Sequence, residues 1–168
     1  KSPINDVCKI KDKIQGIVEV KYEEIDDYIL LRSDGSPTFL LSSAVDDYDM
    51  KVTDIIRGDD HLTNSFRQKV IFDFLEYRPN FAHISLIHNE NNQKLSKRDN
   101  APSILQYKEK GYLSKAINNY LMRLGWSFGD KEIFTIEEIE KKFSLENIGK
   151  SPSKHDKKKL DFLNNYYL

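Results

Sequence analysis

Residues 52–61 read VTDIIRGDDH, and this stretch decides the fold because an apolar, β-branched run passes directly into a polar cluster. A short run of this kind predicts a strand over residues 52–56. Thr63, Asn64 and Ser65 follow, and each offers N-cap chemistry for a helix. We therefore predict a strand that ends in polar residues and leads into a helix.

A second strand is predicted after that helix. Apolar residues recur at helical spacing as far as the breaker Arg78-Pro79-Asn80, and a new apolar run occupies residues 81–87. Strand, helix and strand in this order, with polar residues at the carboxyl end of the first strand, are typical of an open α/β sheet and of the crevice where it binds ligands. The middle of the chain is therefore predicted to have an α/β fold.

The flanking regions differ from this middle part. Residues 1–32 alternate short apolar pieces with charged and turn residues, which predicts β-structure. Residues 38–45 are mostly apolar, and their pattern fits a strand or a helix. From Pro102 onward the pattern is helical, with Ser114 as one expected cap and a capping box at residues 135–138. The chain thus begins β-rich, continues as α/β and ends helical.

Composition and charge narrow the function classes. The 168 residues are 39% hydrophobic and 32% charged, as in a globular chain, and the net charge of −1 means that any phosphate or RNA contact must be local. Cys8 is the one cysteine, which excludes an intramolecular disulfide and a multi-cysteine zinc site and fits a reducing cytoplasm. No structural zinc is therefore expected. No apolar run approaches the roughly 18 residues of a membrane span, so no membrane partner is expected either.

The pentapeptide KLSKR, residues 94–98, carries three positive charges in a segment predicted as a loop. Lysines in a loop just beyond a strand end are suited to holding a polyphosphate, because ammonium groups neutralise charge that grows on phosphate oxygens. The alternative is a solvated basic turn, which is the usual role of a short charge run.

Arg57 is the other candidate for anion binding. A guanidinium at a strand end suits bidentate capture of a carboxylate or phosphate, although an ion pair with Asp59 or Asp60 is equally compatible with the sequence. His61 is placed to stack on or hydrogen-bond a base. The other three histidines, His83 among them, are expected at the surface or in satisfied packing positions. The four histidines share no metal-ligand spacing, so no metal site is predicted.

Taken together, these motifs resemble the glutamyl-tRNA synthetase family of class I aminoacyl-tRNA synthetases. KLSKR is similar to the KMSKS-type loop of that family. Further matching segments occur in the family's order along the chain, at residues 32–39, 45–50, 52–61, 112–121, 123–126, 132–135 and 159–164. Several collinear motifs are far more specific than any one of them.

The resemblance implies an α/β fold that forms the second half of a class I synthetase Rossmann-type catalytic fold. Residues 1–32 would be the end of a β-rich connective insertion domain, residues 33–99 the C-terminal half of the catalytic domain with the KLSKR loop, and residues 100–168 a helical stem-contact domain. The family pairs its loop with a HIGH motif, and no His-x-Gly-His sequence occurs here. The early substrate-binding residues and the anticodon-binding region are also missing, which indicates an internal fragment.

The resemblance also implies roles for individual residues. Lys94 and Lys97 would hold the ATP phosphates and stabilise the transition state of adenylate formation, with Arg98 in support. The implied ATP-binding residues are Asp60, His61, Leu86 and Lys97, and the implied glutamate-binding residues are Phe39, Ser43 and Arg57. Phe39 departs from the family, which commonly has tyrosine there, so a hydroxyl contact to substrate is lost, and Ser43 falls at a variable position.

The implied activity is that of a glutamate–tRNA ligase in the cytoplasm. Such an enzyme uses ATP and Mg²⁺ to make glutamyl-adenylate and then esterifies the 3′ end of tRNA(Glu); the sequence leaves tRNA(Gln) open as a second substrate. The fragment alone is expected to be inactive, because half of the ATP site is missing. The alternatives are a glutamyl-queuosine tRNA synthetase-like paralogue and a non-catalytic RNA- or nucleotide-binding module.

Overall fold

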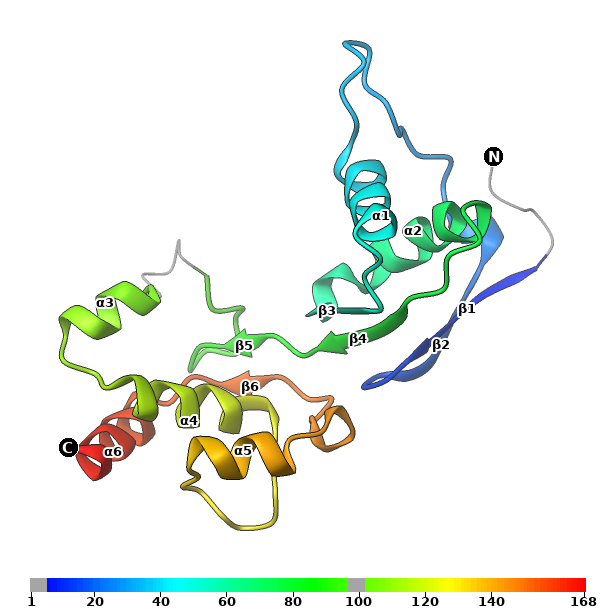
Figure 1. Cartoon of the computed structure of the whole chain (residues 1–168). Coiled ribbons are helices and arrows are strands. Elements are labelled where there is room, and N and C mark those ends of the chain that lie inside the picture. Colours follow the sequence, from blue (N-terminus) through cyan, green and yellow to red (C-terminus); the bar gives the residue numbers. More distant parts are fainter. Residues whose placement is uncertain (1–5, 97–101) are drawn as a thin grey trace. The chain divides into compact units, whose positions relative to one another are not determined.

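The computed structural model describes residues 6–96 and 102–168 (Figure 1). The chain divides into two compact units, of which the first ends at His83 and the second begins at Ile84. In the described ranges no helix is both long and apolar enough to cross a membrane.

The first unit is built on a four-stranded sheet in the order β2-β1-β4-β3. Strand β1 (Val7–Asp12) pairs antiparallel with β2 (Gly16–Lys21), and its last residue pairs parallel with Phe81 of β4 (Asn80–Ile84). Strand β3 (Asp54–Gly58) occupies the edge next to β4. The α/β prediction is therefore confirmed, with the N-terminal hairpin joined to the sheet.

Two helices pack together in this unit (Figure 1). The pattern of residues 38–45 fitted either a strand or a helix. In the structure Thr38 is the N-cap of helix α1 (Phe39–Asp49), and the residues after it are helical. A short 3₁₀ turn η2 (Asp59–His61) leads from β3 into helix α2 (Leu62–Phe74). Helix α2 begins at Leu62, and its N-cap residue, His61, makes no side-chain capping hydrogen bond. The prediction that Thr63, Asn64 or Ser65 caps this helix is therefore wrong.

The core of the first unit lies between the sheet and the helices. Its buried members come from strands, from helices and, for Ile25, from the segment between β2 and α1: Cys8, Ile10, Ile25, Ala44, Ile55, Phe66, Phe72 and Phe81. Helix α2 does not bury all its apolar residues, since Phe74 is 87% exposed. It buries Ser65 and Gln68 instead, and neither has any exposed surface. Polar groups are buried at a cost unless they are hydrogen-bonded, so these two residues mark the part of the unit where chemistry is expected.

In the described ranges the second unit combines a two-stranded sheet with four α-helices and the 3₁₀ helix η4 (Leu145–Asn147). Strand β5 (Ile87–His88) pairs parallel with β6 (Ser153–Lys154), and the one strand predicted over residues 81–87 is in fact interrupted after Ile84. The helices are α3 (Ile104–Glu109), α4 (Ser114–Gly125), α5 (Ile136–Lys142) and α6 (Lys157–Tyr167). The helical prediction for this region is therefore confirmed.

Helices α4 and α6 form the core of the second unit. Buried residues of α4 pack against Leu160 and Leu163 of α6, neither of which is exposed. The predicted capping box is present, because the Thr135 hydroxyl accepts from the Glu138 backbone N–H and the Glu138 carboxylate accepts from that of Thr135. Ser114, by contrast, is the first helical residue and not the cap of α4, so that prediction is wrong.

Candidate functional site

Arg57 is held at the carboxyl end of β3 by side chains of helix α2 and strand β4. Its Nη2 group donates to the Ser65 hydroxyl and to the Gln68 amide oxygen, each at 2.6 Å. Its Nε group donates to the His83 Nε2 atom at 3.4 Å. Since the guanidinium is fixed by side chains other than carboxylates, its positive charge stays available to an anionic ligand.

The electrostatic surroundings of Arg57 leave that charge in place. Burial lowers the pKa of Arg57, while the Asp47 carboxylate acts in the opposite direction. An arginine starts from a pKa above 12, so the guanidinium remains protonated at neutral pH. A half-buried, permanently charged group with oriented N–H donors is a suitable receptor for a carboxylate or a phosphate.

Gln68 connects Arg57 to helix α1. Its amide oxygen accepts from Arg57, and its Nε2 group donates to the Ser43 hydroxyl at 2.6 Å. Ser43 in turn donates to the backbone carbonyl of Phe39 at 2.7 Å. The three residues that the sequence predicted for the glutamate pocket therefore lie in one hydrogen-bonded group, with Gln68 at its centre.

The predicted nucleotide-binding residues of the first unit lie next to this group. The rings of Phe39 and His61 are tilted relative to each other with centroids 5.9 Å apart, and Phe39 is 53% exposed. His61 Nδ1 also lies 3.1 Å from the Asn64 amide nitrogen. Asp60 occupies the same 3₁₀ turn as His61. The first unit thus brings together Phe39, Ser43, Arg57, Asp60 and His61.

Two other predicted site residues belong to the second unit. Leu86 lies half-buried between β4 and β5. Lys94 forms an isolated antiparallel β-bridge with His88 of β5. The backbone N–H of Leu95 donates to the carbonyl oxygen of Ile87, also in β5, at 2.8 Å. The first part of the KLSKR segment is therefore bonded to β5, whereas the sequence predicted only a loop beyond a strand end. Lys97 and Arg98 lie outside the described residues.

The sequence did not single out Ser65, Gln68 or Asp12. Ser65 and Gln68 are three residues apart and interrupt the buried face of α2, and a polar pair at this spacing is the signal that was available. In β1 every second residue is buried, and Asp12 continues the series of Cys8 and Ile10. A carboxylate in phase with core residues was the corresponding signal for Asp12.

Asp12 accepts a dense set of hydrogen bonds. Its Oδ1 atom accepts from the backbone N–H groups of Ile14 at 2.9 Å, Gln15 at 2.8 Å and His83 at 3.2 Å, and its Oδ2 atom lies 2.6 Å from His83 Nδ1. Burial acts to raise the pKa of Asp12, but the hydrogen bonds from Gln15, His83 and Ile14 outweigh it and hold the pKa below its usual value. The group is therefore an ionised carboxylate.

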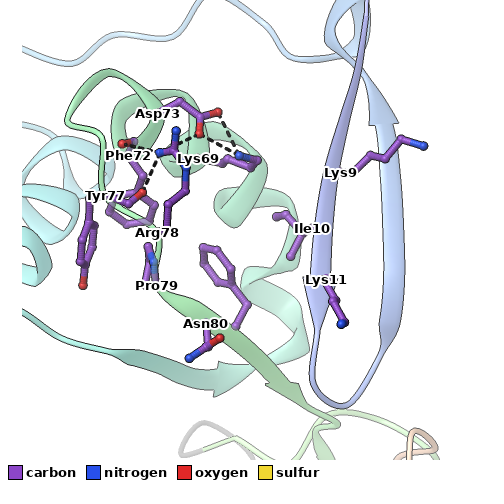
Figure 2. Close-up of a pocket in the computed structure, with 11 residues that line it drawn as sticks. Lys9, Ile10, Lys11, Lys69, Phe72, Asp73, Tyr77, Arg78, Pro79 and Asn80 are labelled. Atoms are coloured by element: carbon purple, nitrogen blue, oxygen red, sulfur yellow. Dashed lines mark hydrogen bonds and ion pairs between the residues drawn. The ribbon is translucent and has the colours of Figure 1, made fainter.

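A separate pocket of about 220 Å³ opens elsewhere on the first unit (Figure 2). Figure 2 shows Lys69 and Arg78 directed toward Asp73, at nitrogen–oxygen distances of 2.8 and 3.1 Å. The Asp73 carboxylate partly neutralises the positive charge of Lys69 and Arg78. Within the described ranges, none of the residues that line this pocket is a predicted site residue. We therefore place the candidate site at Arg57.

Replacing Gln68 with methionine is expected to lower the free energy of unfolding by about 1–3 kcal/mol. Methionine matches the buried volume but leaves Arg57 Nη2 and the Ser43 hydroxyl each without one partner. Urea unfolding measures the change. Arg67→Met is the matched control on the same helix. Arg67 pairs with the exposed carboxylate of Asp26 at 3.4 Å, and an ion pair of this kind contributes little to stability. Equal losses in the two variants would contradict a central role for Gln68.

The chain is similar to known proteins in both sequence and structure. The family model described as "tRNA synthetases class I (E and Q), catalytic domain" matches residues 1–162. The chain is 52% identical over 169 residues to "Glutamate--tRNA ligase 2" of Ehrlichia chaffeensis and 52% identical to "Glutamate--tRNA ligase 2" of Rhodospirillum rubrum. Each alignment covers 100% of this chain and 36% of the relative.

A solved structure agrees with these matches. The chain superimposes on a glutamate tRNA ligase from Elizabethkingia meningosepticum, crystallised in complex with its amino acid, with a TM-score of 0.89 and 32% sequence identity. The superposition covers 99% of this chain and 37% of the solved one. The chain therefore spans little more than a third of the length of the proteins it matches.

Proposed function

Because the chain belongs to the class I tRNA synthetase (E and Q) catalytic-domain family, we propose that it forms part of a glutamate–tRNA ligase. The observation that carries the proposal is the guanidinium of Arg57, fixed by Ser65, Gln68 and His83 beside the candidate pocket residues Phe39 and Ser43. A rigid, charged fork suits a substrate that carries carboxylates. The relatives named glutamate–tRNA ligase support glutamate as that substrate.

In the proposed reaction, a carboxylate oxygen of glutamate attacks the α-phosphorus of MgATP and pyrophosphate leaves. A 3′-terminal hydroxyl of tRNA(Glu) then attacks the carbonyl carbon of glutamyl-adenylate and AMP leaves. Arg57 binds a carboxylate of glutamate through both steps and so fixes its orientation. Phe39 and Ser43 line the same pocket.

The nucleotide-binding roles belong to the KLSKR segment and to three further residues. Lys94 and Lys97, supported by Arg98, neutralise the charge that develops on the phosphates as pyrophosphate departs. Asp60, His61 and Leu86 complete the ATP-binding set. These roles follow from the match of KLSKR to the KMSKS-type loop and of residues 52–61 to the corresponding family segment.

We further assign the chain to the second half of the catalytic fold, with residues 1–32 ending an insertion domain, residues 33–99 carrying the loop, and residues 100–168 contacting the tRNA stem in the cytoplasm. The presence of KLSKR without a His-x-Gly-His sequence supports this assignment. It implies that the 168 residues alone lack the groups that hold the opposite side of ATP.

The proposal is tested by glutamate-dependent exchange between ATP and pyrophosphate, with tRNA supplied. The full-length protein that contains this chain is expected to catalyse exchange with glutamate and not with aspartate at the same concentration. The isolated 168-residue chain is expected to give little or no exchange. Failure of the full-length protein would contradict the ligase function, whereas robust exchange by the isolated chain would contradict only the assignment to half of the fold.

A further inference from the structure

Asp12, His83 and Arg57 form a buried chain of hydrogen bonds that links three neighbouring strands of the sheet. Asp12 ends β1, His83 lies in β4 and Arg57 lies in β3. Neither side chain, of Asp12 or of His83, has any exposed surface. Nothing in the proposed reaction uses either residue, yet His83 is hydrogen-bonded to Arg57, and Asp12 is connected to Arg57 through His83.

The hydrogen bonds of Asp12 determine which nitrogen of His83 carries a proton. An ionised carboxylate only accepts hydrogen bonds, so the His83 Nδ1 atom, 2.6 Å from Asp12 Oδ2, must be the donor. The His83 Nε2 atom faces the Ser65 hydroxyl at 2.8 Å and the Arg57 Nε–H at 3.4 Å. Because the Arg57 Nε–H can only donate, Nε2 must present its lone pair to serve as the acceptor.

The same contacts fix the plane of the guanidinium. The Nε–H of Arg57 and its Nη2 group are engaged by His83, Ser65 and Gln68. Within residues 6–96 and 102–168, the remaining Nη1 group has no hydrogen-bond partner. One edge of the planar group is therefore anchored and one amine is left for a ligand.

We propose that Asp12 and His83 are positioning residues, which hold Arg57 in the orientation that binds the substrate carboxylate by fixing the His83 imidazole as an Nε2 acceptor. The inference rests on the proposed function of Arg57. It adds a role for two residues that lie 71 positions apart and that have no part in the proposed reaction itself. A carboxylate that orients a histidine, which in turn orients a third group, is a general way to preorganise a polar site.

Asp12→Asn is the sharpest test, because it preserves shape and inverts the hydrogen-bond pattern. The asparagine amide has one oxygen, and three backbone N–H groups converge where Asp12 Oδ1 lies. The amide oxygen is therefore expected to remain there and to direct the NH₂ group toward His83 Nδ1. That nitrogen must then accept, Nε2 becomes protonated, and it opposes the Arg57 Nε–H donor.

The measurement is pyrophosphate exchange by the full-length protein, with tRNA supplied and with the KM for glutamate and for ATP determined separately. Asp12→Asn is expected to raise the glutamate KM about tenfold to a hundredfold, the range expected for a lost hydrogen bond to a charged group. The ATP KM is expected to stay within about threefold of the wild-type value. Asp54→Asn is the matched control, because Asp54 lies in the same sheet and pairs with the partly exposed Lys13 at 2.5 Å; it should change neither KM.

Two variants of His83 separate positioning from folding if Asp12→Asn is poorly folded. His83→Gln places an amide oxygen near the former Nε2 atom and so keeps an acceptor for Arg57. His83→Asn keeps a donor toward Asp12 but removes the acceptor near Arg57. Positioning predicts that His83→Asn raises the glutamate KM more than His83→Gln does, whatever their order of thermal stability.

The outcomes distinguish this inference from the proposed function. An unchanged glutamate KM in folded Asp12→Asn, or equal glutamate KM values in the two His83 variants, would overturn the positioning role while Arg57→Met still raised the glutamate KM. If Arg57→Met left the glutamate KM unchanged, the proposed function of Arg57 itself would fail. If Asp12→Asn lost thermal stability but kept the wild-type glutamate KM, Asp12 and His83 would serve folding only, and the inference would be overturned.

Discussion

Replacing Arg57 with methionine in the full-length protein is expected to raise the KM for glutamate about a hundredfold and to leave the KM for ATP nearly unchanged. Methionine keeps much of the buried stem and removes the charged fork, so the substrate carboxylate loses its charge-assisted partner. Loss of one member of a buried, hydrogen-bonded charge pair costs about 2–5 kcal/mol, and each 1.4 kcal/mol is a tenfold change. Pyrophosphate exchange at varied glutamate and ATP concentrations measures both constants.

Arg57→Lys is the informative companion to that variant. Lysine restores the charge but not the planar set of donors that Ser65, Gln68 and His83 hold in place. Its glutamate KM is expected to lie between those of wild type and Arg57→Met. A lysine variant as active as wild type would mean that charge alone is used and that the geometry described around Arg57 is irrelevant to binding.

The second large effect is expected at Lys97. Lys97→Ala in the full-length protein is expected to lower the rate of glutamate activation about a hundredfold to a thousandfold, the range found when one preorganised donor to a developing anion is removed. The glutamate KM should change little, because the loop is proposed to act on the phosphates and not on the amino acid. Single-turnover formation of glutamyl-adenylate, with tRNA supplied, measures the step directly.

Lys108→Ala provides the control for this variant, because Lys108 lies near the end of helix α3 and outside the KLSKR segment. It removes the same charge from the same unit and should leave activation unchanged. If Lys97→Ala activates glutamate normally but binds tRNA more weakly, then KLSKR is an RNA contact and the catalytic assignment of the loop is wrong.

The sequence predicted the order of the elements better than their ends. The strand, the helix after it and the helical C-terminal region follow from hydrophobic periodicity, which is a local property. The prediction of β-structure before residue 32 holds for β1 and β2 but not for residues 28–30, which form no strand, and Leu31 makes only an isolated bridge to Pro37. Apolar residues in a connecting segment have the same composition as a strand, and only a neighbouring strand can distinguish them.

The residues around Arg57 were predictable to different degrees. Phe39, Ser43, Arg57 and His61 lie in adjoining segments, so a local pattern and a family resemblance could place them together. Asp12 could not be found in this way, because its partner is 71 residues distant and the pairing depends on which strands become neighbours. Sheet order is set by the packing of the whole unit, and no short stretch of sequence encodes it.

The sheet order β2-β1-β4-β3 has a consequence for chimeras between relatives. Strand β1 lies inside the sheet, where Cys8 and Ile10 join the same core as Phe72 and Phe81. In a chimera joined just after β2, the hairpin would come from one relative and the rest of the core from another. The side-chain volumes of the two parts need not match, and a mismatch in a packed core is destabilising. The hairpin β1-β2 and the strands β3 and β4 should therefore come from the same relative, and a junction between β1 and β4 is expected to be destabilising.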